Sequence, residues 1–226
     1  MIPIAFHPIY KHPLPEGHRF PMQKYDLLPQ QLIYEGTAAV SDFFEPETIN
    51  LEHVLRVHSK TYLDDLLQLT LDAKAARKIG FPLSAELVER ELRIANGTLL
   101  GCIKAFENHV SFNIAGGTHH AFTGHGEAFC LLNDQAIAAQ YLLDHHLASK
   151  ILIIDLDVHQ GNGTAEIFRN NTDVFTFSLH GKTNYPFKKE LSDLDIALED
   201  GTNDSTFLSI INETIPKLIE QQKPDF

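Results

Sequence analysis

The chain has 226 residues, 43% of them hydrophobic and 21% charged, which suits one sizeable globular α/β domain with a well-buried core. Its formal net charge of −12 argues against a nucleic-acid groove, which needs a basic face. No apolar run reaches membrane-spanning length and no secretory signal is visible, so we expect no membrane or nucleic-acid partner and a cytoplasmic location. Cys102 and Cys130 occupy apolar positions and are expected to be buried thiols.

Helices dominate the prediction for the first half of the chain. Residues 1–6 are expected to form a short edge strand, and a loop rich in proline and histidine follows at residues 7–22. Apolar spacings of three and four predict helices over residues 23–35, 51–57, 59–69 and 84–107, the first interrupted by Pro29. Ser59 and Ser84 are candidate N-caps. The predicted buried stripes are Tyr62, Leu63, Leu66 and Leu67, then Val88, Leu92, Ala95, Leu99, Cys102 and Phe106.

Strands alternate with helices in the second half. The pattern predicts strands at residues 110–114, 151–154 and 174–179, and helices at 133–146, 164–170 and 206–222, the last kinked or broken by Pro216. The first of these helices is expected to bury Ile137, Ala138, Tyr141 and Leu142. This alternation predicts a three-layer α/β fold, in which helices cover both faces of a mostly parallel sheet, in a single domain spanning residues 1–226. Residues 223–226 look like the approach to another buried strand.

The segment Ile151–Gly163 is where we expect the functional site. Its apolar run stops at Asp155 and is followed by Asp157 and His159, and in an extended chain these three side chains face one side. The carboxyl end of a buried strand is where open α/β sheets build their sites. A helix-capping acid and a surface histidine would be a purely structural reading. The second acid, the apolar strand and the following glycines favour instead a divalent-ion site such as zinc, with Asp157 and His159 as ligands.

A second polar cluster, Gly116-Gly117-Thr118-His119-His120, follows the strand predicted at residues 110–114. In a glycine-rich loop, adjacent histidines can face one cavity, and a neutral histidine there can take a proton from an activated water. A second histidine, held charged by a carboxylate, can stabilise a developing oxyanion. Asp155 and Asn162 are natural hydrogen-bond partners for the two. A histidine pair with structural hydrogen bonds is the alternative.

Two weaker signals lie further along the chain. Phe129 follows a glycine loop and could line a narrow tunnel, although a core position is the commoner role for such a residue. Ser178 ends a strand, and its hydroxyl and neighbouring carbonyls could hold a structural monovalent cation together with Asp155.

Five motifs together resemble the metal-dependent histone deacetylase family, and they follow the family's order over nearly the whole chain. They lie at residues 15–22, 57–63, 115–121, 128–134 and 155–163. The last motif, with Gln160 and Asn162, is most similar to the class IV branch and its bacterial relatives. The resemblance implies the arginase/deacetylase α/β fold. It also implies hydrolysis of an acyl-lysine in a protein or peptide, or of an acetylated polyamine.

The resemblance implies catalytic roles position by position. Asp157 and His159 would bind Zn²⁺, or Fe²⁺ in its place. His120 would act as general base and acid. His119 would be its electrostatic partner, held by Asp155. Asn162 would support His120.

The resemblance also implies binding roles. Phe129 and Tyr185 would line the acyl-lysine tunnel, and Arg19 would lie near an internal channel for acetate release. A structural K⁺ is implied at Asp155, Asp157, His159, Ser178 and Leu179.

The chain departs from the family pattern in two respects. The family has a third metal ligand, an aspartate in a Gly-x-Asp motif, and a catalytic tyrosine in a Gly-Gly-Tyr motif. Because neither occurs before Phe226, we expect the chain to be an N-terminal portion of the catalytic domain. In addition, Ala128 stands where the family has a glycine. One alternative is a catalytically incomplete fragment acting as a binding or regulatory module. The other is a ureohydrolase-type dimanganese enzyme, for which the strand end supplies few aspartates.

Overall fold

The computed structural model describes residues 2–226 and groups them into two compact units, the first ending at Ala138 and the second running from Ala139 to Phe226. The chain passes from one unit to the other within helix α6 (Asp134–Asp144). Each unit has its own three-stranded parallel sheet. Within residues 2–226, no helix has the length and apolar character needed to cross a lipid bilayer.

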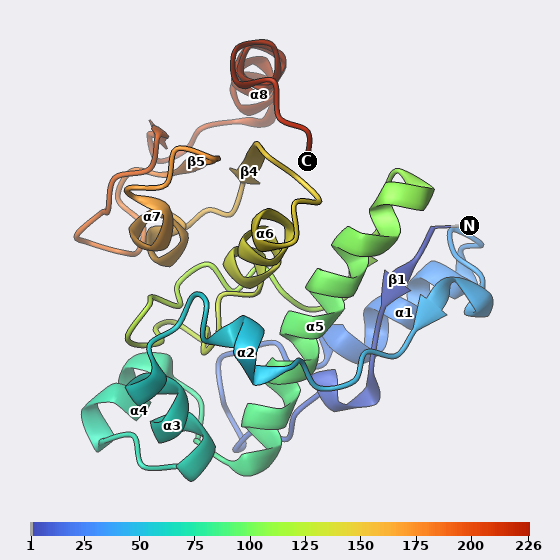
Figure 1. Ribbon diagram of the computed structural model, residues 1–226, viewed down its shortest axis with the longest axis vertical. Coiled ribbons are helices and arrows are strands. Elements are labelled where there is room, and N and C mark those ends of the chain that lie inside the picture. The colour runs from blue at the N-terminus through green and yellow to red at the C-terminus, as the bar shows by residue number, and fades with distance from the viewer. Residues whose placement is uncertain (1) are drawn as a thin grey trace. The chain divides into compact units, whose positions relative to one another are not determined.

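The first unit is built around α5 (Ala85–Asn108), the long green helix in Figure 1. Its start is fixed by Ser84, whose side chain accepts a hydrogen bond from the Leu87 amide, as the sequence predicts. The predicted stripe is buried as far as Leu99, but Cys102 is only partly buried and Phe106 is 44% exposed. A spacing of three and four marks one face of a helix, but it does not say how far neighbouring elements cover that face.

The strands of the first unit are short, and their order corrects one prediction. Strand β1 (Ile4–Ala5) lies between β2 (Phe43–Phe44) and β3 (Phe112–Asn113) and pairs with both in parallel. The prediction of an edge strand at residues 1–6 is therefore wrong, because the sequence pattern did not reveal a strand at Phe43–Phe44. Two short 3-10 turns, η1 (Pro8–Tyr10) and η2 (Val40–Asp42), lie in the connecting loops.

The shorter helices of the first unit agree with the sequence in part. They are α1 (Lys24–Tyr34), α2 (Leu51–Val54), α3 (Lys60–Gln68) and α4 (Ala73–Ile79). Helix α1 continues through Pro29, so the predicted interruption is wrong; a proline removes one helical hydrogen bond and leaves the others in place. Ser59 caps α3 as predicted, although Leu67 is exposed. Helix α4 was not predicted, because its Ala/Lys-rich sequence has no apolar stripe; the Asp72 side chain accepts hydrogen bonds from two amides at its start.

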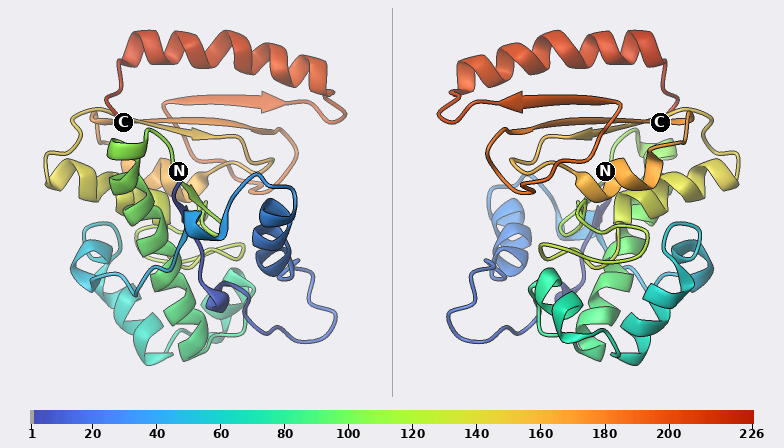
Figure 2. Two further views of the ribbon diagram at one scale, coloured as in Figure 1. Left: turned by 90° about the vertical axis from the view of Figure 1, so that its right-hand side faces the viewer. Right: turned by 90° about the vertical axis from the view of Figure 1, so that its left-hand side faces the viewer.

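The second unit holds a parallel sheet in the order β4-β5-β6, formed by β4 (Ile151–Asp155), β5 (Val174–Gly181) and β6 (Leu194–Leu198). Figures 1 and 2 show α8 (Asp204–Gln222) along one face of this sheet and α7 (Asn162–Phe168) on the other. The core beneath α8 centres on Phe177, Leu179 and Leu218. Helix α8 runs through Pro216, so the predicted kink or break does not end it.

The last residues of the chain run along β4. The Leu152 amide donates a hydrogen bond to the Phe226 carbonyl at 3.0 Å. The Asp225 carboxylate accepts hydrogen bonds from the Ser149 hydroxyl and from the backbone amides of Lys150 and Ser149, and these bonds lower the pKa of the carboxyl group. The residues at 225–226 therefore fix the point at which β4 begins.

Candidate active site

A turn directly after β4 carries the predicted metal ligands. Strand β4 ends at Asp155, so the strand alternation expected to align Asp155, Asp157 and His159 does not extend past it. Two successive side-chain hydrogen bonds make the turn instead. The Asp157 amide donates to Asp155 Oδ1 at 3.0 Å, and the His159 amide donates to Asp157 Oδ1 at 2.8 Å. Aspartate is suited to such bonds because its short side chain reaches the backbone two residues ahead.

The turn brings Asp157 and His159 face to face. Asp157 Oδ1 and His159 Nδ1 lie 2.9 Å apart, and the two side chains are 51% and 41% exposed. Zinc lies about 2.0–2.2 Å from nitrogen and carboxylate oxygen ligands, so two donor atoms at this spacing can share one ion. Among residues 2–226, no group of three or more His, Cys, Asp and Glu side chains is arranged to hold a metal. The pair thus supplies two ligands of a suitable kind.

Gln160, which is fully buried, fixes the turn through hydrogen bonds of its side-chain amide. Its amide nitrogen donates to the Glu190 carbonyl and to Asp195 Oδ1, both at 2.8 Å, and its oxygen accepts from the Glu190 amide at 2.9 Å. All three bonds join the residue after His159 to a segment 30 residues or more further along the chain. From the loop between β5 and β6, the Tyr185 ring lies edge-on to the His159 ring, with centroids 6.3 Å apart.

The end of β4 and the adjacent part of β5 place further predicted residues together. Asp155 lies opposite Ser178 in the parallel ladder, and the Ser178 hydroxyl is 3.0 Å from His180 Nδ1. Burial lowers the pKa of His180. Leu179, the residue between Ser178 and His180 in the sequence, is buried. Asn162 is buried at the first position of α7. Asp155, Ser178 and Leu179 of the predicted cation site therefore lie on neighbouring strands, where β4 ends beside β5.

The histidine pair lies in the first unit, on the loop that follows β3. His119 and His120 are 6% and 4% exposed, and their ring centroids are 4.1 Å apart. The loop reaches them through Gly116 and Gly117, whose φ values of +117° and +67° are left-handed conformations that side chains rarely adopt. Two adjacent histidines are therefore held close together and almost fully out of solvent.

An aromatic cluster in the same unit contains Phe129. Its ring lies 5.0 Å, centroid to centroid, from the rings of Phe20 and Phe81. Phe129 and the preceding Ala128 both have left-handed backbone conformations, with φ of +71° and +43°. The exposed Arg19 side chain places its guanidinium carbon 5.0 Å from the centre of the Phe129 ring. Phe129 and Arg19 are thus brought together on one aromatic surface.

Comparisons with known proteins identify the family. Residues 18–226 match the model of the histone deacetylase domain. The chain belongs to the histone deacetylase family. It is 44% identical to an uncharacterized protein of Picosynechococcus sp. over 99% of this chain and 74% of that protein. It is 31% identical to a protein of Archaeoglobus fulgidus named "Probable deacetylase", over 99% of this chain and 66% of that protein.

A solved structure of a histone deacetylase homolog from Aquifex aeolicus has the same fold. Its TM-score to this chain is 0.84 at 24% identity, and the alignment covers 99% of this chain and 66% of that one. The predicted arginase/deacetylase α/β fold is confirmed. The family is one of hydrolases, so the prediction of an enzyme of the deacetylase type is confirmed at the level of the family.

Several residues that hold the histone deacetylase motifs in place had no role in the sequence prediction. Asp134, His58 and Asp195 are the main ones. Asp134 could have been noticed because short polar side chains at the start of a helix often accept backbone hydrogen bonds. His58 gave no such signal, because only the folded chain shows it buried between two backbone groups, where burial lowers its pKa to about 4.

Proposed function

We propose that this chain forms a metal-dependent deacylase that removes an acetyl-like group from a lysine side chain or a related amine. The observation that carries the proposal is the facing pair of Asp157 Oδ1 and His159 Nδ1 in a chain whose family is established. Carboxylate and imidazole are ligands that Zn²⁺ accepts, and Fe²⁺ is a second candidate. We further propose that residues 1–226 belong to one catalytic domain with a cytoplasmic location, which suits the thiol state of Cys102 and Cys130.

The proposed chemistry divides the work between two sets of residues. Asp157 and His159 would hold the ion, which when bound polarises the amide carbonyl and lowers the pKa of water. His120, as a neutral imidazole, takes the proton from the attacking water and returns it to the leaving amine. His119, held charged by Asp155, stabilises the negative charge that develops on the carbonyl oxygen. Asn162 supports His120 through a hydrogen bond.

Further residues would bind substrate and a structural ion. We propose that Phe129 and Tyr185 contact the aliphatic part of the acyl-lysine and that Arg19 lies on the route of the acetate product. Acyl-lysine in a protein or peptide and acetylated polyamines are both candidate substrates. The proposed K⁺ site consists of Asp155, Asp157, His159, Ser178 and Leu179.

The test is hydrolysis of an Nε-acetyl-lysine peptide and of an acetylated polyamine by the protein loaded with Zn²⁺ or Fe²⁺. Chelation is expected to remove the activity and either metal to restore it. His120→Ala should lower kcat by about a hundredfold or more, since general acid–base catalysis typically contributes that much. His145→Ala is the matched control, because this exposed histidine lies against the Tyr141 carbonyl and ring and has no role in the proposed chemistry. Full activity of His120→Ala would refute the mechanism.

A binding or regulatory module is the second candidate, favoured by the presence of only two metal-binding side chains in the turn after β4. The metal content of the purified protein separates the two. Stoichiometric zinc lost in Asp157→Ala supports the deacylase, whereas a metal-free protein that still binds the acetylated peptide supports the module.

A further inference from the structure

The loop that carries the histidine pair is attached to the start of α6 by one carboxylate. Asp134, which is 1% exposed, accepts four hydrogen bonds. Its Oδ1 accepts from the Thr118 amide at 2.8 Å and the Thr118 hydroxyl at 2.6 Å. Its Oδ2 accepts from the Gly117 amide at 3.1 Å and from the Thr98 hydroxyl of α5 at 2.6 Å. Three of the four donors belong to the two residues directly before His119.

The backbone at Gly116 passes so close to the Asp134 carboxylate that there is no room for a side chain. A Cβ atom on Gly116 would lie 2.5 Å from Asp134 Oδ2, closer than real Cβ contacts allow. A Cβ on Gly117 would meet nothing within 4 Å. The glycine pair is therefore not simply a flexible hinge: at Gly116 the backbone passes against the carboxylate that fixes it.

The far side of the histidine pair is attached to the same point of α6. Asn133 donates from its side-chain nitrogen to the Ala121 carbonyl at 3.2 Å. The His58 ring joins the Phe122 carbonyl to the Asn133 amide. Its Nδ1 is 2.9 Å from the Phe122 carbonyl oxygen, and its Nε2 accepts a hydrogen bond from the Asn133 amide at 2.9 Å. These contacts fix His58 as the tautomer protonated on Nδ1, because a carbonyl can only accept and an amide N–H can only donate.

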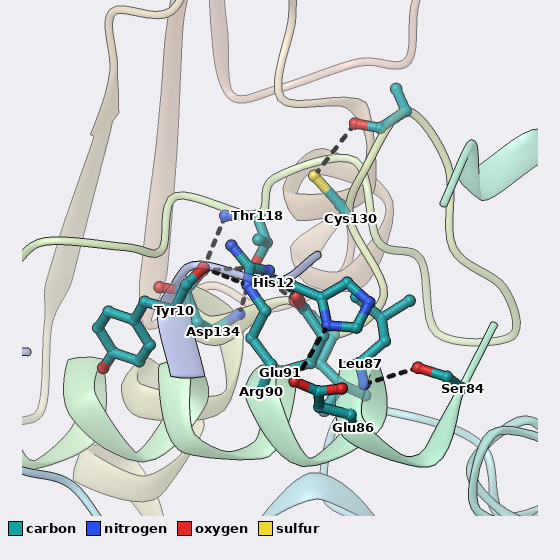
Figure 3. A network of polar contacts seen from close by, with 12 residues as sticks. Tyr10, His12, Ser84, Glu86, Leu87, Arg90, Glu91, Thr118, Cys130 and Asp134 are labelled. Atoms are coloured by element: carbon teal, nitrogen blue, oxygen red, sulfur yellow. Dashed lines mark hydrogen bonds and ion pairs between the residues drawn. The ribbon is translucent and has the colours of Figure 1, made fainter. Parts of the chain in front are cut away.

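Arg90 and Glu91 make a separate set of buried polar contacts in this unit. Figure 3 shows Arg90 and Glu91 on α5, which form a buried ion pair, with Arg90 also donating to the Tyr10 carbonyl at 2.7 Å. Thr118 and Asp134 lie in the same view, joined by their own hydrogen bonds. The Arg90 pair therefore ties the N-terminal loop to α5, whereas Asp134 acts on the residues next to the histidines.

We propose that Asp134 is a positioning residue for the His119–His120 pair, which it orients through Thr118 and Gly117. The catalytic consequence rests on the function proposed above, in which both rings must meet a reacting group in a fixed orientation. A displacement of about 1 Å in such a group can cost about a hundredfold in rate. Asp134 itself touches neither substrate nor metal in this proposal.

The experiment compares Asp134→Asn with the unchanged protein, both loaded with Zn²⁺. The amide nitrogen of asparagine cannot accept a hydrogen bond, so it breaks the bonds at one carboxylate oxygen while keeping the shape of the side chain. We expect kcat on an Nε-acetyl-lysine peptide to fall about a hundredfold with KM little changed. The imidazole NMR signals of ¹⁵N-labelled His119 and His120 should shift, and the Thr118 amide should exchange faster with solvent.

Thr118 provides a second pair of variants if Asp134→Asn does not fold. Thr118→Val removes the hydroxyl that bonds Asp134 Oδ1 and should reproduce the loss in kcat and the imidazole shifts, whereas Thr118→Ser should restore both. Asp72→Asn is the matched control, because the exposed Asp72 carboxylate also accepts two backbone hydrogen bonds but caps α4. Its kcat and imidazole signals should not change.

The outcomes separate this inference from the proposed function. Unchanged imidazole signals in both Asp134→Asn and Thr118→Val would overturn the positioning role, whether or not the protein is active. An unmodified protein that hydrolyses no acetylated substrate, but whose imidazole signals shift in both variants, would refute the deacylase proposal and support the positioning of the pair. A fall in stability without any imidazole shift would show that Asp134 is only structural, and so would overturn the inference.

Discussion

The loop with the histidine pair and the turn with the aspartate–histidine pair hold their side chains by opposite means. His119 and His120 are almost fully buried, and the loop before them is fixed by three hydrogen bonds to the Asp134 carboxylate. Asp157 and His159 are about half exposed, and their side chains bond each other across 2.9 Å. The histidine pair is thus held by the hydrogen bonds of the loop before it, whereas the aspartate–histidine pair points two candidate ligand atoms at each other.

In the function proposed above, this difference suits each region to its task. A side chain that transfers a proton needs a fixed orientation, which burial and the hydrogen bonds of the Asp134 carboxylate supply. A pair that takes up an ion needs access to solvent, and its two ligand atoms can move apart slightly when the ion enters. Breaking either arrangement should therefore affect different properties of the protein: stability for the histidine loop, and metal affinity for the turn.

The largest effect is expected for Gly116→Ala. The new methyl group combines a left-handed backbone with a clash against Asp134, so we expect the free energy of unfolding to fall by roughly 3–4 kcal/mol. Gly117→Ala carries the backbone strain without the clash and should cost about 1 kcal/mol. Urea denaturation of both variants measures the difference. Equal losses would show that Asp134 does not define the path of the loop.

Acid should weaken the histidine loop through His58. In the folded protein burial lowers the pKa of His58 from 6.5 to about 4, so the unfolded chain binds the extra proton as the pH falls. The free energy of unfolding should therefore decrease by about 3 kcal/mol between pH 7 and pH 4, in addition to the effect of other groups. His58→Gln keeps one donor and one acceptor but does not titrate, and its unfolding should lack this component. An identical pH dependence in His58→Gln would contradict the assignment.

Metal should stabilise the turn and leave the histidine loop unchanged. At a free Zn²⁺ concentration one hundred times Kd, binding to the folded state adds about 2.7 kcal/mol to the free energy of unfolding. Hydrogen exchange should slow at residues 155–163 and remain unchanged at residues 116–134. Asp157→Ala should abolish both effects. Protection that appears first in the histidine loop would reverse the roles given to the two regions.

The smallest effect is expected at Ala128, where the sequence departs from the family's glycine. Its φ of +43° is strained for alanine, so Ala128→Gly should raise the free energy of unfolding by about 0.5–1 kcal/mol. Ala75→Gly, inside α4, provides the opposite case and should lower stability by about 1 kcal/mol. Thermal unfolding of the two variants compares them. A destabilised Ala128→Gly would mean that the methyl group makes contacts that outweigh its strain.

The sequence predicted the parts of the fold that depend on local pattern. The apolar run of β4, the Ser84 cap of α5 and the Ser59 cap of α3 are visible in a few consecutive residues, and all three are confirmed. Strands β2 and β6 were missed because they are defined by their neighbours in a sheet and not by alternation along the chain. Pro29 and Pro216 misled the prediction, since each lies inside a continuous helix.

In the candidate site too, the sequence predicted what depends on nearby residues and missed what depends on distant ones. Asp157 and His159 were recognised by residue type and spacing, although a turn and not a continued strand brings them together. The hydrogen-bond partners of Asp134 and His58 could not be read from the sequence. Each side chain bonds residues at least 16 positions away, and only folding brings those residues within hydrogen-bonding distance.

The three hydrogen bonds of the Gln160 side chain limit how the aspartate–histidine turn could be grafted onto another protein. Gln160 uses two donors and one acceptor at once, on Glu190 and Asp195. Neither glutamate, which lacks the donors, nor histidine, which has only two ring nitrogens, can reproduce all three bonds. The smallest transplantable module is therefore discontinuous: a nine-residue peptide copied from 155–163 would carry both ligand atoms but lose the support that aims them.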